Sequence, residues 1–203
     1  YILSELGVEN YLDLLFALGF DSLRETGIQA DLGLALGAGE VSLLELVNAF
    51  SVFARDGLYS PVCIFENDKK KEEIKIFEKD TARIICDILS DKYARLGGFG
   101  YTQTYQTSYP SIFKTGTSNQ YQNIVALGST VDYTVGVWMG NFTGETVIGK
   151  TGSSLPGYVA RKILDFLNGD DYKEFLQAES FEKVPVCSLS GMSLSYDCPN
   201  QLY

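Results

Sequence analysis

Histidine is missing from this sequence of 203 residues. Its absence excludes Ser-His-Asp and Cys-His catalysis and removes the commonest zinc ligand. The four cysteines, Cys63, Cys86, Cys187 and Cys198, show no Cys-x-x-Cys spacing of the kind that binds metals. We therefore predict no metal site and no cofactor, and any nucleophile must be activated by a group other than histidine.

Basic residues are also few. The chain has 16 Lys and Arg against 26 Asp and Glu, a formal charge of -10. Such a surface repels phosphate backbones, so nucleic acid is not expected as a partner. No apolar run approaches the roughly 20 residues of a membrane span, and no signal segment opens the chain. Because the chain starts at Tyr1 without Met, we expect upstream sequence, and any membrane attachment would lie there.

The hydrophobic content of 45% is enough for the packed core of one domain, with or without an appendage. Apolar positions at helical spacing predict a helix over 9–18 that stops at Gly19. They predict another over 41–55 that stops before Gly57. A capped amphipathic helix is predicted over 80–89.

Strand patterns follow the first two helices. Apolar pieces at 62–65 and 74–77, around a charged turn, predict a surface hairpin. A last helix is predicted over 156–167, with Ser154 as its cap. Helices on both sides of a strand meander predict an α/β protein of the α+β type, with an antiparallel sheet flanked by helices. The three strands predicted for that meander are 111–116, 123–128 and 133–139.

The tail contains two of the cysteines. Cys187 and Cys198 bracket the Ser/Gly-rich segment 188–193, and a disulfide between them would need an oxidising compartment. Pairing cannot be read from one sequence, so both states stay open. Cys86 lies within a helical pattern and is expected in the core.

The most informative motif is Lys114-Thr115-Gly116-Thr117-Ser118, on the first strand of the meander. Gly116 lets a ligand backbone approach closely, and the flanking cation and hydroxyls are able to bind a carboxylate. A strand of this kind can take up an extended peptide by edge addition. The alternative is a strand exit with a solvated lysine.

With its surroundings, the motif resembles that of class A penicillin-binding proteins. In that family a Lys-Thr-Gly-Thr strand is followed by a Val-Gly-Val-Trp-x-Gly strand, here Lys114–Thr117 and Val135–Gly140. The segments Leu34–Leu46 and Phe53–Gly57 are similar to the stretch between the family's second and third motifs. The resemblance implies the penicillin-binding, β-lactamase-like transpeptidase fold, incomplete at its N-terminus. It also implies that residues 1–180 are the C-terminal portion of that domain.

Residues 181–203 would be a linker and the start of a C-terminal extension, most like the penicillin-binding protein 1C type. The resemblance also implies an extracytoplasmic bacterial enzyme whose serine attacks the D-Ala-D-Ala bond of peptidoglycan stem peptides, and which binds β-lactams. Lys114 and Thr117 would be catalytic, and Thr115, Gly116, Thr117 and Ser118 would bind substrate. The backbone N–H of Thr117 would form half of an oxyanion hole.

The family's serine is not identified in this chain. Ser-x-x-Lys occurs at 111–114, where a strand would place the two side chains on opposite faces, and at 180–183, far downstream of the family's order. Tyr121-Gln122-Asn123 imitates the second motif in the wrong order and is read as a turn. We expect the first two motifs upstream of Tyr1, and this chain alone to be inactive.

Residues 144–151 fit the P-loop pattern, yet the predicted helix starts only near residue 156, so no nucleotide is expected. Two other functions stay open: a β-lactamase or β-lactam sensor with the same third motif, and a non-catalytic module that keeps only the sheet.

Overall fold

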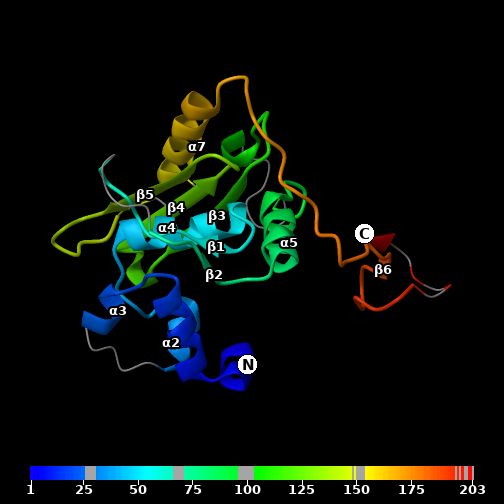
Figure 1. Ribbon diagram of the computed structural model, residues 1–203, viewed down its shortest axis with the longest axis horizontal. Helices are drawn as coiled ribbons and strands as arrows, with labels where there is room; N and C mark the ends of the chain where they lie inside the picture. The colour runs from blue at the N-terminus through cyan, green and yellow to red at the C-terminus, as the bar shows by residue number, and fades with distance from the viewer. Residues whose placement is uncertain are drawn as a thin grey trace.

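A computed structural model describes residues 1–25, 31–65, 71–95, 103–147, 149, 154–194, 196, 198 and 201–202. Its centre is an antiparallel sheet of β3 (Ile112–Thr117), β4 (Asn123–Ser129) and β5 (Thr134–Gly140), in that spatial order. Helix α7 (Leu155–Asn168) covers one face, and helices α4 (Leu43–Ala54) and α5 (Lys79–Ser90) cover the other (Figure 1). The predicted meander and the α+β class are confirmed.

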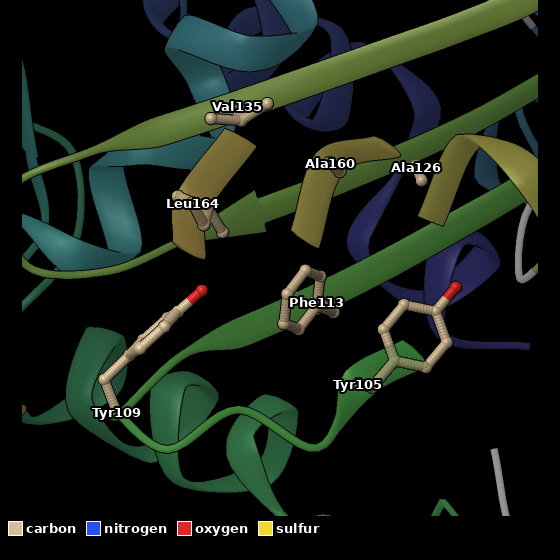
Figure 2. Close-up of a cluster of buried hydrophobic side chains, with 7 residues drawn as sticks. All are labelled: Tyr105, Tyr109, Phe113, Ala126, Val135, Ala160 and Leu164. Carbon is tan, nitrogen blue, oxygen red and sulfur yellow. The ribbon is translucent and has the colours of Figure 1, made fainter. Parts of the chain in front are cut away.

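The sheet has a core on each face because successive side chains of a strand point to opposite sides. Phe113, Ala126 and Val135 pack against Ala160 and Leu164 of α7 (Figure 2). On the other face, the buried side chains of the sheet pack against α4 and α5, in a cluster of Ile112, Leu127, Phe50 and Cys86. The expected core position of Cys86 is confirmed, since its side chain is buried.

Two glycines let the helices approach the sheet closely. A Cβ at Gly128 would lie 2.9 Å from Leu164 Cδ1 on the α7 side, and one at Gly136 would lie 2.1 Å from Val47 Cγ2 on the α4 side. Real Cβ atoms do not tolerate such distances, so the close packing of α7 and α4 on the sheet requires glycine at these two positions.

The N-terminal part is helical and contains α1 (Ile2–Leu6), α2 (Val8–Ala17), α3 (Ser22–Glu25) and the 3-10 turn η1 (Leu32–Leu36). Helix α2 gives way to Gly19 with φ 82°, as the sequence predicts. The carboxylate of Glu45 joins α4 to α3. It accepts hydrogen bonds from the backbone N–H and hydroxyl of Ser22 and also completes a capping box with Ser42.

The predicted hairpin has a different first strand. Strand β2 (Ile74–Lys75) pairs with β1 (Leu58–Tyr59), whereas 62–65 forms no strand and its side chains are exposed. The reason is Gly57, at φ 87°, whose carbonyl accepts the N–H groups of Ile76 and Phe77 directly after α4. Pairing therefore begins at the end of the helix.

The cap predicted for the helix over 80–89 is not formed. The residue before α5 is Glu78, which makes no side-chain cap, and Asp80 lies in the first turn. Asp80 instead accepts the backbone N–H groups of Glu179 and Ser180 and the Ser180 hydroxyl. Ser154 occupies the N-cap position of α7, as predicted, although its side chain makes no cap hydrogen bond, and Pro156 is the helix's second residue.

After α7, residues 169–183 form an extended segment that we call the strap (Figure 1, orange). Arg83 of α5, only 9% exposed, donates to Asp56 at 3.0 and 2.8 Å and to the Gln177 carbonyl of the strap at 3.2 Å. Its hydrogen bond to Asp56 raises the pKa of Arg83. The strap thus lies against α5 through a buried cation.

Beyond the strap, the described residues between 184 and 202 form a small unit, the tail unit, with strands β6 (Val186–Cys187) and β7 (Gln201–Leu202). It lies to one side of the sheet and its helices (Figure 1). The predicted boundary near residue 180 stays a prediction. None of the helices in the described part of the chain has the length and apolar character that a bilayer span needs.

Candidate functional site

The Lys114–Ser118 segment lies at the outer edge of the sheet. Its strand, β3, pairs with β4 on one side and is the first strand of the order β3-β4-β5. Lys114, Gly116 and Thr117 are exposed, and Thr115 is half-buried. The motif therefore occupies the kind of strand to which an extended peptide can be added.

The backbone groups of the motif alternate between the partner strand and the open edge. The N–H of Ser118 donates to the Asn123 carbonyl at 2.9 Å, so Ser118 faces β4. By alternation, Thr117, Thr115 and Phe113 direct their N–H and C=O groups to the edge. Two side-chain bonds agree with this phase, because Lys114 Nζ donates to the Thr115 carbonyl at 2.8 Å and Arg95 donates to the Phe113 carbonyl at 3.5 Å.

The motif's side chains lie on both faces of the strand. Lys114 and Gly116 point to the side of α4 and α5, and Thr115 and Thr117 to the side of α7. Because β3 is an edge strand, side chains from both faces flank one line of outward backbone groups. A ligand along that line is within reach of the ammonium and of both hydroxyls.

Gly116 has free space around its Cα, unlike Gly128 and Gly136, which pack against the helices. A Cβ at Gly116 would meet no atom within 4 Å. The segment's last residue, Ser118, is engaged in the following turn, where its hydroxyl accepts the Asn123 N–H at 2.8 Å. That turn holds Gln120 and Tyr121 at φ 60° and 56°, which is uncommon for residues other than glycine.

Arg95 is a residue near this edge that sequence reasoning missed. Its guanidinium lies over the rings of Tyr105 and Phe113, at 5.6 and 5.8 Å from their centroids. Burial lowers the pKa of Arg95. No local pattern marks it, because its partner is a backbone carbonyl 18 residues away in the sequence.

The other serine motifs do not form a catalytic pair. Ser111 is buried, its hydroxyl is hydrogen-bonded to Thr107 at 2.7 Å, and it lies next to an extended strand. Ser180 lies in the strap, bonded to Asp80. Tyr121 lies in a turn, as predicted. Part of the P-loop match, including Lys150 and Thr151, falls outside the described residues, and α7 begins only at Leu155.

The described cavities lie away from the motif. A cavity of about 450 Å³ is lined by the end of α5, the segment that leads into β3 and the strap. Its lining includes Tyr105, Tyr109 and Ser111. Across the described ranges, no three His, Cys, Asp or Glu side chains gather as a metal site. Lys114, Gly116 and Thr117 of the motif are exposed at the edge of the sheet.

This arrangement defines an α+β domain whose edge strand carries a cation, a glycine and hydroxyls along its open side. A family model described as "Penicillin binding protein transpeptidase domain" matches residues 3–146. The chain therefore belongs to the penicillin-binding protein transpeptidase family.

Curated relatives agree with this assignment. The chain is 25% identical to penicillin-binding protein 1A of Clostridium novyi, over 93% of this chain and 23% of that protein. It is 26% identical to penicillin-binding protein 1C of Escherichia coli, over 74% of this chain and 19% of that protein. The chain thus spans about a fifth to a quarter of the length of these relatives.

Solved structures share the fold. Penicillin-binding protein 1A from Haemophilus influenzae matches with a TM-score of 0.77 at 17% identity, over 99% of this chain and 37% of that one. The PonA1 protein from Mycobacterium tuberculosis, solved in complex with penicillin V, matches with a TM-score of 0.66 at 18% identity, over 85% of this chain and 53% of that one. The predicted transpeptidase fold is confirmed.

Proposed function

We propose that the Lys114–Ser118 segment binds the D-Ala-D-Ala end of peptidoglycan stem peptides, and β-lactams in its place, as part of a serine-type DD-transpeptidase. The observation that carries this proposal is the position of the motif on an open edge strand with outward backbone groups at Thr115 and Thr117. Edge addition supplies main-chain hydrogen bonds to an extended peptide, and a β-lactam has the same amide and carboxylate groups.

Each residue of the segment has a role that its position supports. The exposed ammonium of Lys114 would favour deprotonation of the nucleophile and attract the ligand carboxylate. The hydroxyls of Thr115 and Thr117 would bind that carboxylate, and the outward N–H of Thr117 would stabilise the oxyanion. Gly116 would let the ligand backbone lie close to the strand, and Ser118 would fix the turn that holds Thr117.

The serine nucleophile is proposed to come from sequence outside these 203 residues. Neither Ser-x-x-Lys string has helical geometry, and the matched relatives are several times longer than this chain. In the reaction, the serine would displace D-Ala to form an acyl-enzyme, and an amine of a neighbouring stem peptide would resolve it. We propose an extracytoplasmic location for this chemistry. The 1C type of the tail stays a prediction, since relatives of both the 1A and the 1C type match.

Labelling with a fluorescent penicillin tests the proposal. The intact gene product should label, and the 203-residue chain alone should not. Lys114→Ala should slow labelling by about 100-fold, the loss expected when one charge within a few ångströms of the reacting groups is removed. Lys162→Ala, which removes an exposed lysine from α7, is the matched control and should label normally.

Gly116→Val provides a second arm. Because the structure has open space at this Cβ, valine should leave the fold intact and hinder only the ligand. Normal acylation of the intact Gly116→Val protein would contradict the assigned binding edge. Rapid loss of label with release of hydrolysed penicillin would favour the β-lactamase alternative, and a complete absence of labelling would favour the non-catalytic one.

A further inference from the structure

The tail unit has no buried side chain over residues 184–194. Leu189, Met192 and Val184 are 80%, 72% and 57% exposed. A unit of this size cannot be held by burying apolar surface, and small units without a core usually depend on a covalent cross-link or a metal. The described residues offer no metal cluster.

The backbone of the tail unit brings its two cysteines together. The N–H of Cys187 donates to the Met192 carbonyl, and the N–H of Gly191 donates to the Cys187 carbonyl, each at 2.8 Å. Strand β7 then returns beside β6, with Gln201 opposite Cys187. Cys198 precedes Gln201 by three residues, and its thiol donates a hydrogen bond to the sulfur of Cys187.

We propose that Cys187 and Cys198 form an intramolecular disulfide that holds the tail unit together. The pair lies outside the segment matched to the transpeptidase family, so this inference is independent of the proposed function. The bond would close a loop over residues 188–197, in which Leu189 and Met192 are exposed. It would thereby replace the core that the unit lacks.

The surroundings of Cys187 favour the first chemical step. The hydrogen bond from the Cys198 thiol, together with hydrogen bonds from the backbone N–H groups of Ser190 and Leu189, lowers the pKa of Cys187 to about 7. Much of this thiol is therefore a thiolate at neutral pH, which is the form that attacks disulfides.

With glutathione disulfide as the oxidant, the step is balanced. The Cys187 thiolate attacks one sulfur, forms a mixed disulfide and releases one glutathione thiolate. Cys198 then loses its proton to solvent and attacks the Cys187 sulfur, which releases the second glutathione. Two protein thiols are oxidised and one glutathione disulfide is reduced to two glutathione molecules.

The test uses the full chain, reduced and then treated with glutathione disulfide. We expect the count of reactive thiols in denaturant to fall from four to two, and peptide mapping without reductant to find 187 joined to 198. Cys187→Ser and Cys198→Ser should each abolish this linkage. Cys63→Ser, which removes an exposed cysteine elsewhere, is the matched control and should retain it.

Hydrogen exchange gives a second readout. Oxidation should slow exchange of the Cys187 and Gly191 amides by roughly 100-fold, the effect expected for closing a loop of this length. Four remaining thiols, lasting glutathione adducts on Cys187, linkage through Cys63, or unchanged amide exchange after oxidation would overturn the proposal.

Discussion

Replacing Gly136 by alanine measures how tightly α4 packs against the sheet. A Cβ at this position in β5 would lie 2.1 Å from Val47 Cγ2 and 3.0 Å from Leu127 Cδ2. Carbon atoms pack best at about 3.5–4.0 Å. Alanine therefore forces α4 outward or Val47 from its rotamer, and β-branched residues in helices resist the latter. We expect the free energy of unfolding to fall by about 1–3 kcal/mol.

Urea unfolding followed by the fluorescence of Trp138, the chain's one tryptophan, is the assay. For an m value of about 3 kcal/mol/M, the midpoint should fall by roughly 0.3–1 M. Gly116→Ala is the matched control on the same face of the sheet, where a Cβ meets nothing within 4 Å. Its stability should be unchanged or raised by up to about 1 kcal/mol, because alanine restricts the unfolded chain.

A double-mutant cycle with Val47→Ala decides whether the steric contact is the cause. Removing the methyl groups of Val47 should relieve Gly136→Ala, with a coupling energy of about 1–2 kcal/mol. The reasoning is refuted if Gly136→Ala has the same cost in both backgrounds, or if Gly116→Ala costs as much as Gly136→Ala.

Three further predictions concern the core, the capping box and the cysteines. Leu164→Ala, at a fully buried site of α7, should lower the free energy of unfolding by about 2–5 kcal/mol, as measured by urea unfolding. The control Phe166→Ala, at an 86% exposed site, should change it by less than about 0.5 kcal/mol. Burial raises the pKa of Glu45, but hydrogen bonds from Ser22 and Ser42 outweigh it, and the net pKa is below 4.5. The stabilisation by Glu45 is then complete above that value and is lost as pH falls through the lower folded-state pKa. Glu45→Gln should therefore reduce Tm at neutral pH and flatten its fall between about pH 5 and pH 3; an unchanged acid slope would contradict this. Burial raises the pKa of Cys86 to about 12, so iodoacetamide near neutral pH should modify exposed Cys63 and spare Cys86 until unfolding, as mass spectrometry can establish. Equal modification of both in the folded chain would be inconsistent with this burial.

Sequence reasoning was strongest where the signal is local. The three strands and the helices α2, α4, α5 and α7 were predicted within a few residues, because the hydrophobic period is set by each element's own geometry. It failed at Asp80 and at 62–65, where the outcome depends on partners distant in sequence. The carboxylate of Asp80 is occupied by hydrogen bonds from the strap, whose residues lie about a hundred positions later in the sequence.

The Lys114–Ser118 motif shows the same division. Residue types and spacing indicated a strand whose cation, glycine and hydroxyls are able to bind a carboxylate, and the resemblance of the motif and its surroundings implied the family. They could not establish that β3 is an edge strand or which carbonyls point outward. Both depend on pairing with β4 and its register.

The sequence by itself determined the three strands of the meander, the helices α2, α4, α5 and α7, the motif and the absence of histidine chemistry, because these depend on side-chain identity and local periodicity. Only the tertiary structure decided that Arg83 is buried under the strap, that Gly116 is open while Gly136 is filled, and that Cys198 lies against Cys187. Each of these depends on which distant segments meet. A single sequence does not encode such contacts in any local pattern.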